Sequence, residues 1–124
     1  MMTGTVNDLN EAVLRLTVRG PKGEREVEAV VDTGFDGALT LPSYLVAELG
    51  LPFGIEGRSL LGDGTTVLFD AHKGIVLWNG QPRRIWVEVA DTEPLLGTRL
   101  LRGRELKIEF VEGGSVAIRD LRTF

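Results

Sequence analysis

The sequence contains no cysteine and only one histidine, His72, among its 124 residues. It therefore has neither a disulfide framework nor a thiolate metal site, and a site made only of histidines would need several chains. Basic residues are also outnumbered, because 14 Lys and Arg stand against 18 Asp and Glu and give a net charge of −4. Since phosphate binding needs a basic face, we expect no nucleic-acid partner.

Long apolar runs are absent as well. No run approaches the ~18 residues that a membrane helix needs, so we expect no membrane partner. The first residues, MMTGTVNDLNEAV, lack the basic and apolar regions of a signal peptide. We therefore expect a cytoplasmic protein.

Glycine, in contrast, is abundant: its 16 residues indicate many tight turns and favour β structure over a helical bundle. Residues 1–12 are polar, and we expect them to form a flexible segment. We expect residues 13–124 to form a single domain. Alternating apolar residues predict strands at 13–19 and 24–32, and a Gly-Pro-Lys-Gly turn joins them into a hairpin that ends at Asp32.

After this hairpin the pattern predicts a short strand at 38–41 and one clear helix at 42–50, which begins at Pro42 and ends at Gly50. Further strands are expected at 58–61, 66–69, 73–78, 83–89, 105–110 and 115–120, and a short helical segment follows Gly97. The sequence thus predicts a mostly β domain of about eight or nine short strands with two short helices, arranged as a barrel or a sandwich.

The stretch VVDTGFDGALTLP, residues 30–42, ends an apolar strand on the carboxylate of Asp32. One interpretation is structural, because an aspartate at a strand end commonly bonds to nearby backbone amides. Asp36 has a similar interpretation as a residue that caps its own loop. Asp63 has one as the solvated tip of a hairpin, because Asp-Gly is favourable in turns.

Three features in order carry a resemblance: the hairpin that ends in DTG, a glycine-containing hairpin, and the turn Leu95-Leu96-Gly97 before a short helix. This order resembles the retropepsin-like aspartic proteases of clan AA, over residues 13–110. The stretch VDTGFDGALTLPSYLVAELGL is similar to the prokaryotic branch, in which phenylalanine follows DTG. The resemblance implies the acid-protease fold, a closed or partly open β-barrel with one or two short helices and one lobe per chain.

Retropepsins carry one DTG per chain, so the resemblance implies a homodimer in which Asp32 of each protomer is catalytic. Two carboxylates about 3 Å apart repel by roughly 5 kcal/mol at an effective dielectric of about 20, so the pair would share one proton, as aspartic proteases are known to do. The ionised carboxyl would act as general base on a water, and the protonated one would polarise the scissile carbonyl. The implied activity is that of an aspartic endopeptidase acting on peptide or protein, with no metal and no cofactor.

The resemblance also gives roles to the neighbours of Asp32. Thr33 would bond across the two-fold axis, and Gly34 would let the substrate backbone approach closely. Leu95, Leu96 and Gly97 would pack beneath the catalytic loop as support. The residues implied to contact substrate are Gly34, Phe35 and Asp36 in the loop, and Gly62, Asp63, Gly64 and Thr65 in a flap that closes over the peptide.

Phe35 departs from the small residue that is usual in retroviral enzymes, and its ring would narrow a subsite if it faced the cleft. Two other hypotheses stay open. The chain could be a catalytically silent dimer of the same fold that binds peptide or protein, or a monomeric β module in which DTG is only a turn. Oligomeric state separates the last hypothesis from the others, and turnover separates the first two.

Overall fold

The computed structural model describes residues 1–121, apart from the side chain of Ser59, and contains ten strands and two short helices in them. The strands are β1 (Met2–Val6), β2 (Ala12–Gly20), β3 (Gly23–Val31), β4 (Leu39–Leu41), β5 (Phe53–Leu60), β6 (Thr66–Trp78), β7 (Gln81–Val89), β8 (Leu95–Leu96), β9 (Arg104–Ile108) and β10 (Ser115–Asp120). The helices are α1 (Ser43–Leu49) and α2 (Thr98–Leu101). The last three residues of the expected domain, 122–124, lie outside the described residues.

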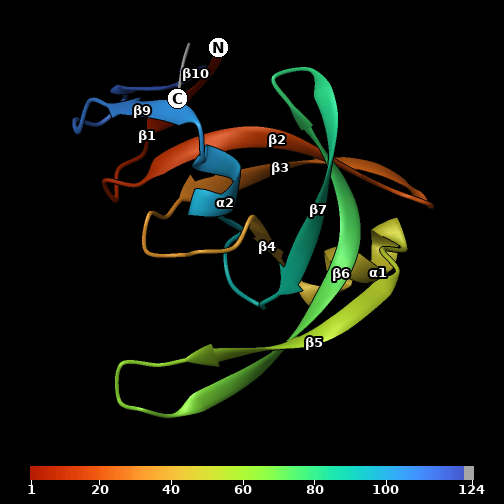
Figure 1. The fold of residues 1–124 in the computed structure, drawn as a ribbon. Helices are drawn as coiled ribbons and strands as arrows, with labels where there is room; N and C mark the ends of the chain where they lie inside the picture. The colour runs from red at the N-terminus through yellow and green to blue at the C-terminus, as the bar shows by residue number, and fades with distance from the viewer. Residues whose placement is uncertain (122–124) are drawn as a thin grey trace.

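Six of these strands close into a barrel (Figure 1). They follow one another in the order β6-β7-β4-β8-β3-β2, and the pairing of β2 with β6 joins the two ends. Most neighbouring strands are antiparallel, but β3 and β8 are parallel, as are β4 and β7. The predicted fold class, a mostly β barrel with two short helices, is confirmed.

Apolar side chains at alternating positions of the strands fill the inside of this barrel. In β2, Leu14, Leu16 and Val18 are buried and the residues between them are exposed or half-buried. Helix α1 turns Leu45, Val46 and Leu49 into the same core. Each of these side chains is removed from water by packing on the others, which is the main favourable contribution to folding.

The expectation that residues 1–12 form a flexible segment is wrong for residues 2–6. Strand β1 pairs with β10 and with β2, and Val6 is buried beside Ala12 and Val116. The partner strand β10 lies far along the chain, which is why the local sequence did not reveal this pairing. Figure 1 shows β1, β9 and β10 together at one end of the molecule.

Strands β5 and β6 form a long hairpin that extends away from the barrel (Figure 1). They pair from Phe53 opposite His72 to Leu60 opposite Thr66. Where the sequence predicts two strands, 66–69 and 73–78, the structure has the single strand β6, whose second half pairs with β2 and β7 in the barrel. The hairpin is therefore a direct extension of a barrel strand. In residues 1–121, neither helix has the length and apolar content to cross a membrane.

Candidate active site

Asp32 is the first residue after β3 and opens the loop of residues 32–38. Its backbone N–H donates to the Leu96 carbonyl oxygen at 2.9 Å and so continues the parallel pairing of β3 with β8 beyond the end of the strand. Its carboxylate Oδ1 accepts a hydrogen bond from the Gly34 N–H at 2.9 Å, and its carbonyl oxygen accepts one from the Phe35 N–H at 3.1 Å. Asp32 is half-buried. Both its side chain and its main chain hold the turn.

The turn Leu95-Leu96-Gly97 lies directly against this loop. The Gly97 N–H donates to the Ala38 carbonyl oxygen at 2.9 Å, and the Thr98 N–H donates to the Phe35 carbonyl oxygen at 2.9 Å. A Cβ atom on Gly97 would collide with the Gly37 carbonyl oxygen and would lie 2.6 Å from the Phe35 ring. Since real Cβ atoms do not approach backbone so closely, the position requires glycine.

The Phe35 ring packs inside its own loop. It is half-buried and covers Gly37 and Gly97, where added Cβ atoms would lie 2.7 Å and 2.6 Å from ring carbons. The ring thus holds the loop against the Leu95-Leu96-Gly97 turn. Part of Phe35 stays exposed at the surface of the loop.

A second carboxylate at the loop, Glu88 of β7, was missed from the sequence. It lies opposite Thr40 in the parallel pairing of β4 with β7, and its Oε2 occupies the space into which a Cβ on Gly37 would project. Burial raises the pKa of Glu88, and the negative charge of Asp36 raises it further. A glutamate within the apolar run RIWVEVA was a visible signal, but its closeness to the loop depends on a parallel pairing that no local pattern indicates.

Two threonines complete the support of the loop, and sequence reasoning missed both. The Thr40 hydroxyl oxygen is buried and accepts the Leu95 N–H at 2.8 Å. The Thr98 hydroxyl donates to the Phe35 carbonyl oxygen at 3.3 Å, beside the bond from its own N–H. Thr40 could have been suspected because it interrupts an apolar strand, and Thr98 because it directly follows Gly97.

The remaining loop residues with implied roles, Thr33, Gly34 and Asp36, are exposed. A threonine that bonds across a two-fold axis would be exposed in a single chain, so the position of Thr33 fits the implied role without testing it. The negative charge of Asp36 contributes to the raised pKa of Glu88. The loop therefore presents these three residues on its outer surface.

The implied flap residues form the tip of the β5–β6 hairpin. The Asp63 carboxylate accepts hydrogen bonds from the Thr65 N–H at 2.9 Å and from the Thr65 hydroxyl at 2.7 Å, and these bonds lower the pKa of Asp63. Gly64 has a φ of 88°, a conformation that glycine adopts freely. Gly62 is exposed like its neighbours. In Figure 1 this tip and the loop of residues 32–38 extend toward the same side of the molecule.

No model of a protein family matches the chain, and neither does any curated protein sequence. Among residues 1–121, acidic and histidine side chains do not gather in groups of three or more that could hold a metal ion. What the site can do is therefore argued from its own geometry.

Proposed function

We propose that this chain is an aspartic endopeptidase that hydrolyses peptide bonds as a homodimer. The observation that carries the proposal is the placement of Asp32, a half-buried residue at the end of a barrel strand. Its loop is tied to β8 and α2 through the Leu96 carbonyl, the Gly97 N–H and the Thr98 N–H. Catalytic groups need such fixed positions, because small displacements from the productive geometry cost much of the rate.

In the proposed dimer the two Asp32 carboxyls face each other across the two-fold axis and share one proton. The ionised carboxylate takes a proton from a water molecule, and the oxygen of that water attacks the carbonyl carbon of the peptide. The protonated carboxyl gives its proton to the carbonyl oxygen. The resulting tetrahedral diol then collapses and its C–N bond breaks. The proton first taken from the water passes to the leaving nitrogen, and the carboxyl that gave its proton to the carbonyl oxygen takes one back from a diol hydroxyl, which restores the shared proton.

The hydrogen bonds of Asp32 leave one of its carboxylate oxygens open for this chemistry. The Gly34 N–H holds Oδ1, and no other side-chain or backbone donor within residues 1–121 is bonded to the carboxylate. The second oxygen, Oδ2, is thus available to a water or to the partner carboxyl. A structural turn aspartate would make the same bond to Gly34. Cleavage activity therefore distinguishes a catalytic Asp32 from a structural one.

Substrate would lie as an extended peptide between the loop and the β5–β6 hairpin. In this proposal the exposed Gly34 admits the peptide backbone, and Asp36 accepts one of its N–H groups. The tip residues Gly62 to Thr65 close over the peptide and exclude water. The packing of Phe35 against Gly97 makes it mainly a support of the loop, with a smaller contribution to a subsite than its size suggests.

The test is cleavage of a mixed peptide library by the wild type and by Asp32→Asn, from about pH 4 to 8. Asparagine keeps an oxygen that can accept the Gly34 N–H, so the loop should stay folded, but it cannot take up the proton. We expect the variant to lose cleavage by about a thousandfold or more. Equal cleavage by both proteins, or none by either, would contradict the proposal that the chain is an aspartic endopeptidase.

A peptide isostere with a hydroxyl at the scissile position separates the enzyme from a silent binding module. The enzyme should bind it more tightly than the matching peptide, because the hydroxyl takes the place of the attacking water. Asp32→Asn should lose this preference. If wild type and variant bind both ligands equally and cleave neither, the chain is a peptide-binding module.

A further inference from the structure

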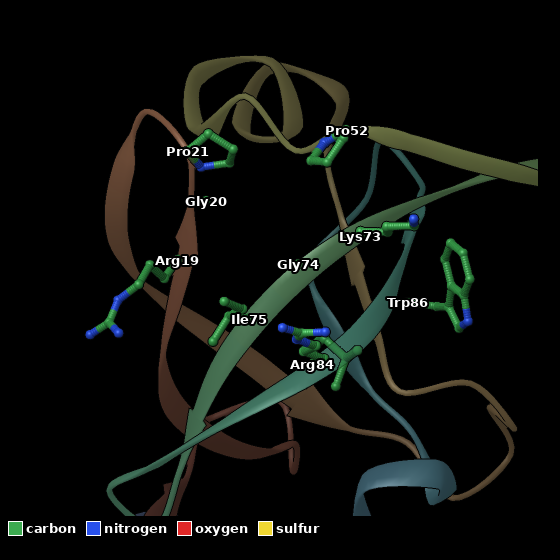
Figure 2. Close-up of a pocket in the computed structure, with 10 residues that line it drawn as sticks. Arg19, Gly20, Pro21, Pro52, Lys73, Gly74, Ile75, Arg84 and Trp86 are labelled. Carbon is green, nitrogen blue, oxygen red and sulfur yellow. The ribbon is translucent and has the colours of Figure 1, made fainter.

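A hollow of about 620 Å³ lies at the base of the β5–β6 hairpin, and no residue of the loop 32–38 lines it. Its volume falls in the range of small-molecule binding sites, about 300–1,000 Å³. In Figure 2, Pro21 and Pro52 lie at the top, Ile75 of β6 and Arg84 of β7 lie below them, and Trp86 of β7 lies to the right near Lys73. The lining residues are Arg19, Gly20, Pro21, Pro52, Lys73, Gly74, Ile75, Arg84, Ile85 and Trp86.

Trp86 gives this hollow a fixed aromatic surface. Its ring lies against Gly54 of β5, where an added Cβ would come within 2.7 Å of a ring carbon. With this contact on one side, 40% of the residue is still exposed. An exposed aromatic ring that is already held in place loses little conformational freedom when a ligand binds.

All of the charged side chains that line the hollow are cationic, although the chain as a whole has a net charge of −4. Arg19 is partly neutralised by Glu24 at 3.1 Å. Lys73 and Arg84, by contrast, form no ion pair with any part of the chain that the structure describes. The local charge is thus opposite in sign to the charge of the molecule.

The strand register places these two cations beside the apolar surface. In the pairing of β6 with β7, Lys73 is opposite Trp86 and Ile75 is opposite Arg84. Side chains at paired positions point to the same face of a sheet, and neighbours two residues apart along a strand share that face. The four side chains therefore form one surface, with a cation at each of two diagonal corners.

We propose that this hollow binds a carboxylate carried on an apolar body. Lys73 and Arg84 contact the carboxylate, because a charge-assisted hydrogen bond to Arg or Lys is stronger than a neutral one. Trp86, Ile75 and the two prolines contact the apolar body. A free apolar acid and the C-terminal end of an apolar peptide share this chemistry. The site does not depend on the function proposed for Asp32.

The site also adjoins the stem of the hairpin. The Lys73 N–H donates to the Pro52 carbonyl oxygen at 2.9 Å, and the next residue pair, Phe53 and His72, stacks edge to face with ring centres 5.5 Å apart. A ligand in the hollow therefore contacts residues that hold the base of β5 and β6. Its occupancy is expected to slow backbone hydrogen exchange in the hairpin.

The test uses the indole N–H signals of the two tryptophans in a ¹⁵N-labelled full chain. The probes are 3-phenylpropionate, N-acetyl-Leu-Phe with a free carboxylate, and the same dipeptide as its C-terminal amide. We expect the carboxylates to shift the Trp86 signal with saturation and to leave the signal of Trp78, which is 3% exposed, unchanged. The amide should bind about tenfold more weakly, because it lacks the charge.

Lys73→Glu with Arg84→Glu should weaken carboxylate binding by about tenfold or more. The control, Arg102→Glu with Lys107→Glu, changes the net charge equally at exposed positions outside the hollow and should bind like the wild type. Circular dichroism checks that both variants fold. Ile75→Trp, which places a larger side chain in the hollow, should also weaken binding.

Saturable binding of either carboxylate that requires Lys73 and Arg84 supports the site. If the dipeptide acid binds and 3-phenylpropionate does not, the carboxylate that the site recognises is a peptide C-terminus. If only 3-phenylpropionate binds, it is a free apolar acid. The proposal is overturned if the amide binds as well as the acid, if both charge variants behave alike, or if no probe shifts Trp86 up to about 10 mM.

Discussion

Gly97 shows how one residue without a side chain fixes the loop that carries Asp32. Gly97→Ala would place a methyl group against the Gly37 carbonyl and the Phe35 ring. We expect a loss of about 1–3 kcal/mol in the free energy of unfolding, since backbone has to move to make room. The same change at Gly62, which has nothing within 4 Å of an added Cβ, is the matched control.

Urea unfolding of the two variants measures the difference. If the loop is held as described, only Gly97→Ala is destabilised, and its peptide cleavage falls as well. Equal stability of Gly97→Ala and Gly62→Ala would show that the turn does not press against the loop.

Glu88 makes the same region sensitive to pH. Its pKa is raised in the folded chain, first by burial and then by Asp36. The folded state therefore favours protonated Glu88, and the stability that this provides is lost as the pH rises from the ordinary pKa of glutamate through the raised value. Above the raised pKa, the ionised form of Glu88 destabilises the folded state.

Glu88→Gln removes this destabilising charge and should raise the midpoint of thermal unfolding at pH 7. Near pH 4 the gain should shrink, because Glu88 is then largely protonated in the wild type. Paired melting curves at the two pH values check this prediction. A gain that is the same at both, or a loss at pH 7 alone, would mean that Glu88 is not desolvated beside Asp36.

At the scale of elements, local signals predicted the hairpins well. Asn79 and Gly80 both have positive φ, 52° and 80°, as the Asn-Gly turn requires. Gly50 ends α1 with a φ of 65°, as expected of a glycine after a helix. These elements were predictable because each depends on residues that are neighbours in the sequence.

Pairings between distant segments were not predictable in the same way. The parallel pairs β3–β8 and β4–β7 join segments more than forty residues apart, and no turn residue marks them. These pairings bring the Leu95-Leu96-Gly97 turn and Glu88 to the loop of Asp32. From the sequence alone, the turn could be placed there only through the resemblance, and Glu88 could not be placed at all.

Strand β1 allows a direct test of the N-terminal pairing. Val6→Asp would put a carboxylate into the cluster of Val6, Ala12 and Val116, and we expect a loss of about 3 kcal/mol or more in unfolding free energy. Thr5→Asp, at an exposed position of the same strand, should cost about 1 kcal/mol or less. Similar values for the two variants would mean that residues 2–6 are not part of the sheet in solution.

At the scale of the whole molecule, one chain supplies one Asp32, so the proposed chemistry needs two chains. Strands β1 and β10 each have neighbours on both sides within the chain, and β9 and β5 are the outer strands of the described sheet. A dimer that extended this sheet at the end formed by β1, β10 and β9 would therefore add strands at β9. In the proposal, only a dimer that also brings the two Asp32 loops together is active.

Subunit mixing tests the shared pair most directly. Wild type and Asp32→Asn are mixed in equal amounts, allowed to exchange subunits, and assayed for peptide cleavage at the same total concentration as the wild type alone. If both carboxyls are needed, only dimers of two wild-type chains cleave, and random pairing leaves about one quarter of the activity. A residual activity of about one half, as expected when each chain acts alone, would contradict the account.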